Sequence, residues 1–143
     1  MIAASRAYIK HQIQKCNSSY VEIKDVFNDD DLALTELKRG YKLNFGTLAT
    51  NTDGNYHTDI VDCSLEIYKI SSEKSELADH DEVYDLAINI KNTILDPEFV
   101  KTSNDFTDII FNSISPEPLP SNDKVFRILL TFQIRKDLAY HGV

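Results

Sequence analysis

The fold is decided by residues 58–95, which read TDIVDCSLEIYKISSEKSELADHDEVYDLAINIKNTIL. In residues 61–68 apolar and polar side chains alternate, which predicts a strand with one apolar and one wetter face, because successive side chains of a strand point to opposite faces. Further along, apolar residues recur at helical spacing, which predicts a helix with one apolar stripe. The apolar strand face comprises Val61, Cys63, Leu65 and Ile67, and the helix stripe comprises Val83, Leu86, Ala87, Ile90 and Ile94.

Acidic residues and a proline mark the ends of this helix. Asp79 with Glu82 three residues later is an acidic version of the capping-box pattern, and both carboxylates suit the positive N-terminus of a helix. We therefore expect residues 71–79 to form a polar loop that leads into the helix. Asp96 precedes Pro97, and proline disfavours the helical conformation of the residue before it, so the helix is expected to end there.

Length and composition indicate a single domain over residues 1–143. The formal net charge of −8 disfavours a protein that grips nucleic acid along its whole surface. No apolar run approaches the length of a membrane span, and the N-terminus lacks the apolar core of a signal peptide. Cys16 and Cys63 form neither a disulfide framework nor a metal-binding pattern, and we expect Cys63 to be a small buried apolar group. We therefore expect the protein to be synthesised in a reducing, intracellular environment.

The segments before the central strand predict a helix, two strands and a short second helix. Residues 20–27 are β-branched and aromatic enough for a strand, and residues 32–38 suit a short helix that Gly40 would close in the left-handed conformation. Residues 41–48 alternate again and predict a strand. The first helix covers residues 2–16, and its apolar side comprises Ile2, Ile9, Ile13 and Cys16.

A long hairpin and two closing strands complete the prediction. Residues 49–56 form the polar loop of the hairpin, with Asp53-Gly54 as the turn dipeptide. Residues 105–114 alternate imperfectly, which either a bulge or a strand buried on both faces would explain. Residues 124–135 are the clearest strand, and its apolar face comprises Phe126, Ile128, Leu130, Phe132 and Ile134.

Together these faces predict an α+β fold. It has a mainly antiparallel sheet with a long β-hairpin, and helices packed on one face of the sheet. The core is expected between the apolar faces of the two long strands and the stripes of the two long helices.

The residues that could carry chemistry form no recognised site. Metal sites need three or four converging ligands, whereas His57 and His80 stand beside acidic residues that suit a strand edge and a helix start. The acidic run at residues 29–31 lacks the spaced ligands of a calcium loop. No serine lies in a nucleophile elbow, and no glycine-rich loop could hold a phosphate. We therefore assign no catalytic, cofactor-binding or metal-binding residue.

Two segments carry groups that the predicted sheet does not need, namely the hairpin tip and the residues after Arg135. A solvated turn and a frayed chain end are one interpretation. The functional interpretation is that both segments contact a neighbouring subunit or another protein, since exposed apolar groups often anchor interfaces. The candidate interface residues are Asn51, Asp53, Asn55, Leu138 and Tyr140.

The order of the elements resembles that of the tail terminator, or tail-completion, proteins of long-tailed bacteriophages. The similarity extends to about residue 135. It comprises the amphipathic first helix, the segment 30–46 that ends LKRGYKLNFG, the long strand 59–70, the helix that begins DEVYDLA at residue 81, and the closing strand 126–135.

This resemblance implies a structural virion protein without catalytic residues or a cofactor. Such a protein forms a ring, typically of six subunits, that caps the finished tail tube and presents a surface to the head-side neck. Its partners would be further copies of itself, the tail tube protein and a head-completion or neck protein, with no membrane involved. DNA would pass through the lumen without specific binding. The protein would be made in the cytoplasm of the host bacterium and reside at the tail–neck junction of the virion.

Two other classes of function stay open on the sequence. One is a different oligomeric neck or tail component, such as a head-completion adaptor or a tube subunit. The other is a small enzyme whose site forms only in three dimensions. Native mass measurement separates them, since the first class forms a closed oligomer and the second a monomer with a polar pocket.

Overall fold

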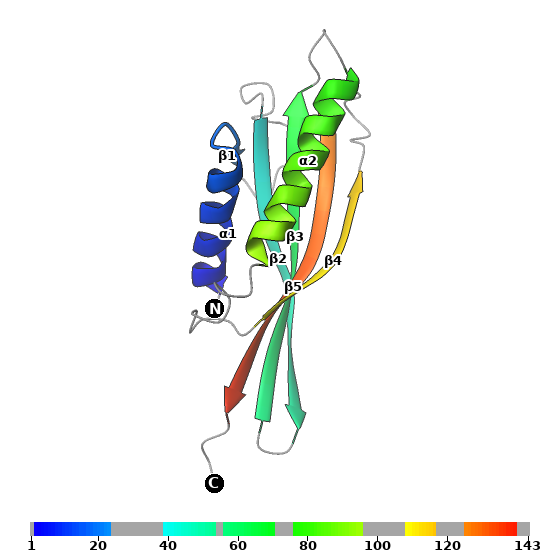
Figure 1. Cartoon of the computed structure of the whole chain (residues 1–143). Coiled ribbons are helices and arrows are strands. Elements are labelled where there is room, and N and C mark those ends of the chain that lie inside the picture. Colours follow the sequence, from blue (N-terminus) through cyan, green and yellow to red (C-terminus); the bar gives the residue numbers. More distant parts are fainter. Residues whose placement is uncertain are drawn as a thin grey trace.

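The computed structural model describes residues 2–23, 39–53, 56–70, 76–95, 108–116 and 125–139. Within these ranges, two helices pack on one face of a five-stranded sheet (Figure 1). The helices are α1 (Ile2–Cys16) and α2 (Glu76–Ile94), and the strands are β1 (Val21–Glu22), β2 (Arg39–Asp53), β3 (Tyr56–Ile70), β4 (Asp108–Pro116) and β5 (Val125–Ala139).

The sheet has the strand order β1-β2-β3-β5-β4. Strands β2, β3, β5 and β4 pair antiparallel, and the short β1 pairs parallel with the start of β2. The predicted α+β class with a mainly antiparallel sheet and a long hairpin is therefore confirmed. The predicted short helix at residues 32–38, the turn residue Gly54 and the helix end at Asp96-Pro97 lie outside the described residues.

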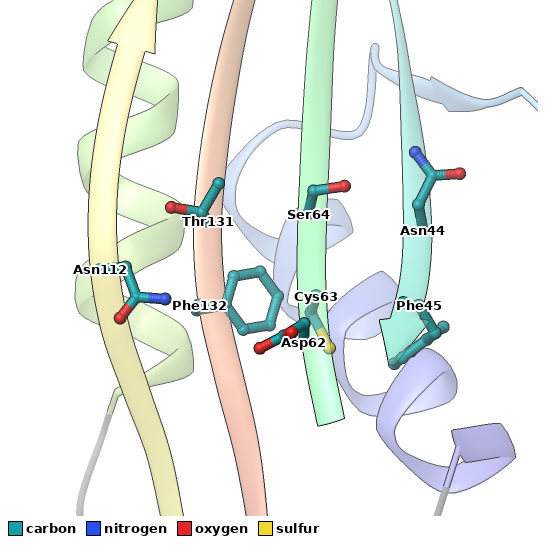
Figure 2. A pocket seen from close by; sticks show the side chains of 9 residues that line it. Asn44, Phe45, Asp62, Cys63, Ser64, Asn112, Thr131 and Phe132 are labelled. Atoms are coloured by element: carbon teal, nitrogen blue, oxygen red, sulfur yellow. The ribbon is translucent and has the colours of Figure 1, made fainter. Parts of the chain in front are cut away.

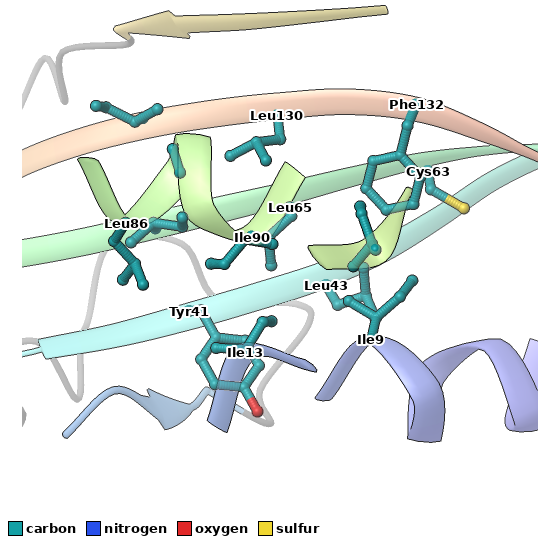
Figure 3. Packing of buried hydrophobic residues seen from close by; sticks show 14 of the residues in the cluster. Ile9, Ile13, Tyr41, Leu43, Cys63, Leu65, Leu86, Ile90, Leu130 and Phe132 are labelled. Carbon is teal, nitrogen blue, oxygen red and sulfur yellow. The ribbon is translucent and has the colours of Figure 1, made fainter. Parts of the chain in front are cut away.

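The core lies where the sequence predicts it, between the two helices and one face of β3 and β5 (Figure 3). Burial of each large apolar side chain there contributes roughly 1.5–3 kcal/mol to folding. Helix α1 packs through the predicted Ile9 and Ile13 and also through Tyr8, which was not predicted, whereas the predicted Ile2 is exposed. The buried strand residues comprise Val61, Cys63, Leu65, Ile67, Ile128, Leu130, Phe132 and Ile134, and α2 buries all of its predicted stripe.

The hairpin and β5 are longer than predicted. The residues expected to form a polar loop continue β2 as far as Asp53, and β3 begins already at Tyr56. Likewise β5 continues to Ala139, although its apolar alternation stops at Arg135. The prediction of a polar loop is therefore wrong for residues 49–53, and the interpretation of the chain end as frayed is wrong for residues 136–139. Threonine is abundant in the hairpin, and its β-branched side chain suits an exposed strand as well as a turn.

Two predicted helix ends are also wrong. Helix α2 begins at Glu76, so Asp79 is not a cap but lies inside the helix, where it is buried. Gly40 does not close a helix but pairs with Val21 in the sheet. A Cβ atom at this position would lie 3.1 Å from Cδ1 of Ile23, so glycine allows the chain after β1 to approach β2 closely.

A row of four paired residues crosses the sheet at the level where both outer long strands are irregular. The row is Phe45, Cys63, Phe132 and Phe111. Strand β2 carries a bulge directly after this row, between Phe45 and Leu48, and β4 carries one between Phe111 and Ser113. Bulges increase the local twist, and the long strands cross over one another near the start of β4 (Figure 1). Of the two explanations for the imperfect alternation of residues 105–114, the bulge is the one observed.

Candidate functional site

The most unusual surface is a three-stranded ribbon that extends beyond the helices (Figure 1). We define the ribbon as residues 49–53 of β2, 56–60 of β3 and 135–139 of β5. The core ends at the row in which Leu48, Val61 and Ile134 pair, because none of the described ribbon side chains is buried. A ribbon of this size without a covered apolar face contributes little stability by itself.

Hydroxyl groups and charged groups connect the strands of the ribbon. Thr50 Oγ1 donates to Asp59 Oδ1 at 2.6 Å, and Thr58 Oγ1 donates to Asp137 Oδ1 at 3.1 Å. Thr52 Oγ1 lies 3.1 Å from His57 Nδ1. All of these contacts are exposed to solvent, where each hydrogen bond adds about 1 kcal/mol or less. The ribbon is therefore ordered by polar pairs along its strands rather than by packing.

The structure brings together the two predicted interface segments. Asn51 is exposed and pairs with Thr58, and the backbone of Leu138 pairs with His57 in the same ribbon. Asp53 ends β2 opposite Tyr56. Asn55 and Tyr140 lie outside the described residues. The hairpin tip and the chain end, which are far apart in the sequence, thus form one continuous surface.

A shallow hollow lies on the opposite face of the sheet from the helices, at the level of the two bulges (Figure 2). Its volume is about 330 Å³, and polar side chains from four strands line it. Its one charged lining group, Asp62, accepts a hydrogen bond of 2.8 Å from Gln133 Nε2. The hollow was not predicted from the sequence. The imperfect alternation of β4 was the one feature of the sequence that pointed to the bulge beside it. The polar lining residues are Asn44, Asp62, Ser64, Asn112 and Thr131.

The hollow does not contain the groups for nucleophilic or acid–base catalysis. Burial raises the pKa of the Cys63 thiol to about 12, with a smaller contribution from the charge of Asp62. A thiol with such a pKa stays protonated near neutral pH and is a poor nucleophile. Asp62 has no second carboxylate beside it among the residues that line the hollow. The lining of the hollow thus combines apolar surface from residues such as Phe45 and Phe132 with a few hydrogen-bonding side chains.

A cluster of charged residues connects the far end of the sheet with the first turns of α2. Lys69 Nζ lies 2.7 Å from Asp79 Oδ1 and also contacts Glu82. Arg39 donates to both carboxylate oxygens of Glu82, at 3.2 and 3.4 Å, and the Tyr20 hydroxyl donates to Glu82 at 3.4 Å. Two cations thus face two anions, and the charges of the cluster balance.

Partial burial and pairing shift the pKa values in this cluster. Desolvation alone would raise the pKa of Glu82, but hydrogen bonds from Lys69 and Arg39 outweigh it and lower that pKa below its ordinary value. Desolvation would lower the pKa of Lys69, and bonds to Asp79 and Glu82 outweigh it in turn. Glu82 and Lys69 are therefore both stabilised in their charged forms. The cluster holds α2 against β2 and β3, which is a structural role.

A second polar cluster occupies the other face of the sheet. The Tyr68 hydroxyl donates to Glu66 at 2.7 Å, and Arg127 Nη1 lies 3.6 Å from Glu66 Oε1. Tyr68 is only 3 % exposed, so the expectation that this whole face of β3 is wetter is wrong at its end. Burial, and then the bond to Glu66, raises the pKa of Tyr68.

Neither a metal site nor a membrane span is found in the part of the chain that the structure describes. No group of three or more His, Cys, Asp or Glu side chains there could hold a metal ion. Among the same residues, neither helix is long and apolar enough to cross a membrane. The assignment of no metal and no cofactor stays a prediction.

Comparison with known proteins adds no assignment. Neither a model of a protein family nor a curated protein sequence matches this chain. The ribbon therefore has to be interpreted from its own geometry.

Proposed function

We propose that this protein is a structural subunit that forms a ring, caps the tail tube of a long-tailed bacteriophage and joins it to the head-side neck. The order of elements that resembles the tail terminator proteins supports this role. The observation that carries the proposal is the ribbon, which lacks buried side chains among its described residues and yet extends well beyond the helices.

The ribbon suits a contact between subunits. A ring needs a heterologous contact, in which one patch of a subunit meets a different patch of the next. The ribbon exposes hydroxyl, amide and charged groups on three adjacent strands, including Asn51 and Asp137. Such a surface becomes covered only when another protein packs against it. The hollow and the charged clusters do not offer a comparable projecting surface.

Native mass spectrometry and electron microscopy of the purified protein test the ring. The expected result is one closed oligomer whose images show a central hole. A monomer at micromolar concentration would contradict the proposal.

Binding to tail tubes tests the place of the ring. Gold-labelled protein is mixed with purified tail tubes that lack their terminator. The expected result is one label at one end of each tube. Label along the side of the tubes, or no label, would rule out the capping role even if the protein forms a ring.

A variant in which a two-residue turn replaces residues 50–59 is expected to lose both the ring and the end label, while Asn89→Lys on the exposed side of α2 retains both.

A further inference from the structure

Most charged residues of the sheet lie on its inner strands. Strand β3 carries Asp59, Asp62, Glu66 and Lys69, and β5 carries Arg127, Arg135, Lys136 and Asp137. By contrast, β2 has no charged residue between positions 43 and 52, and β4 has none between positions 109 and 116. These two charge-free segments belong to the two long strands that flank β3 and β5.

Both charge-free segments have an open side in the part of the chain that the structure describes. Strand β1 pairs with β2 only at Gly40 and Tyr41, and the following N–H of Ile23 donates to the Tyr41 carbonyl at 2.8 Å. No described strand pairs with the outer side of β2 beyond this point, or with the outer side of β4. The Leu43 carbonyl accepts a hydrogen bond of 3.4 Å from Arg6 of α1, so the open side of β2 begins after Leu43. Beyond that point, neither segment has a strand partner among the described residues.

Open edges of this kind are normally protected. Proteins place charged residues, above all lysine, and proline on edge strands, because an uncharged edge pairs readily with another chain. Here most charges lie on the inner strands, and the two edge segments carry only a bulge each and the terminal Pro116 of β4. The distribution is the reverse of the protective one, and it favours pairing with another strand.

The directions of the two edges are complementary. Since β2, β3, β5 and β4 alternate in direction, β4 runs opposite to β2. A second copy placed beside the first in the same orientation would bring its β2 next to β4 of the first as an antiparallel neighbour. Both edges also carry their bulge next to the row of Cys63 and Phe132. When two copies stand side by side at the same height, the bulges therefore lie opposite each other, and the regular strand segments on either side of them face each other.

We propose that subunits join edge to edge, with the outer side of β4 in one copy paired antiparallel to the outer side of β2, residues 44–49, in the next copy, because β4 extends along the sheet only from the level of Ala49 to that of Tyr41. The contact is heterologous, and each copy uses both of its charge-free edges. Pairing of β2 with β2 would leave every β4 edge open, whereas the head-to-tail contact leaves none when the ring closes. This inference rests on the proposed ring: the edges join the subunits, and the ribbon, which extends past the end of β4, adds a second contact.

Two edge variants and a matched control test the pairing. Thr47→Lys with Ala49→Lys places two lysines on the β2 edge, and Ser113→Lys with Ser115→Lys places two on the β4 edge. All four side chains are exposed, so the changes leave the core intact. The control, Asn89→Lys with Asn92→Lys, adds the same charge on the exposed side of α2. Native mass spectrometry gives the size of each variant, and thermal melting shows that it is folded.

Mixing the two edge variants gives the decisive result. Each variant alone is expected to be a monomer, and the control a ring of the parent size. An equimolar mixture is expected to form a dimer and nothing larger, because only β4 of the β2 variant and β2 of the β4 variant remain able to pair. Rings from either edge variant, or a mixture that stays monomeric, would overturn the inference.

Hydrogen exchange on the unchanged protein provides an independent measurement. The backbone amides on the outer sides of β2 and β4 are expected to exchange at least tenfold more slowly in the ring than in the monomer obtained by dilution. Equal exchange at both edges in ring and monomer would overturn the edge pairing while leaving the ring intact. A protein that forms no ring at all would instead contradict the proposed function, so the two failures are distinguishable.

Discussion

Lys69 and Asp79 form an ion pair that is almost completely buried between the end of β3 and the second turn of α2. The Lys69 Nζ and Asp79 Oδ1 atoms are 2.7 Å apart, and their side chains are 10 % and 5 % exposed. A buried charge costs several kcal/mol unless it is paired. The pair therefore ties the position of α2 to that of β3.

Lys69→Met is expected to destabilise the fold strongly, because it removes the ammonium group that Asp79 and Glu82 share. Loss of one partner of a buried ion pair costs about 3–5 kcal/mol. The matched control is Lys10→Met, which removes a half-exposed ammonium group from Glu22 while Arg6 still pairs with that carboxylate, and it should cost at most about 1 kcal/mol. Urea denaturation measures both free energies of unfolding. Equal losses in the two variants would contradict the structural role of the buried pair.

The stability of the protein is expected to fall in acid, with a contribution from Glu82. Pairing lowers the pKa of this carboxyl below its ordinary value of 4.5 in the folded state. The stabilisation is therefore fully present above pH 4.5 and is lost as the pH falls through the lower, folded-state pKa. Melting temperature against pH is the measurement, and Glu82→Gln should show a smaller decrease below pH 4.5 than the parent. Parallel curves would show that Glu82 does not contribute.

Leu130→Asp is expected to unfold the protein, because Leu130 is completely buried on the core face of β5. A carboxylate at this position costs several kcal/mol, which is comparable with the total stability of a small domain. Ile110→Asp in the neighbouring strand is the control, since Ile110 is 37 % exposed. Circular dichroism melting compares the two. A Leu130→Asp protein that melts like the parent would show that this face is not the core.

Tyr41→Phe is expected to be neutral or stabilising. Tyr41 is 1 % exposed, and its hydroxyl has no hydrogen-bond partner among the described residues. Burial raises the pKa of this hydroxyl to about 12. Removing an unsatisfied buried polar group avoids its desolvation cost of about 1–3 kcal/mol. A decrease in the free energy of unfolding of more than about 1 kcal/mol would mean that the hydroxyl has a partner.

Truncation after Lys136 is expected to leave the fold intact and weaken the ring. It removes Leu138 and Tyr140 together with Asp137, whose carboxylate accepts the Thr58 hydroxyl. Since none of the described ribbon side chains is buried, the melting temperature should change by only a few degrees, as for a loss of about 1 kcal/mol. Removal of residues 141–143 alone is the control. Rings of equal stability in both truncations would place the interface elsewhere.

The core could be predicted from the sequence because its signal is periodic. The alternation of apolar residues correctly predicted that Val61 and Leu130 are buried, and the helical spacing correctly predicted that Ile90 is buried. The strand ends could not be predicted, because the polar and threonine-rich residues of the ribbon suit a loop and an exposed strand equally well. Alternation reports which residues are buried, and the described side chains of the ribbon form no buried face.

Asp79 shows a different limit. An acidic residue near the start of a helix suits a cap, and nothing in the local pattern distinguishes this from an ion pair with a lysine of the preceding strand. The distinction depends on how α2 packs against β3. The charge-free segments at residues 43–52 and 109–116 are visible in the sequence, but only the strand order reveals that both are edges.

The end of the core at Val61 and Ile134 has a consequence for how such a protein can change over generations. Substitutions in the body must preserve packing, whereas substitutions in the ribbon alter no buried contact among the described residues. The body can therefore stay constant while the ribbon diverges along with whatever it binds. Partner choice can then drift or be exchanged between lineages without endangering the ability to fold.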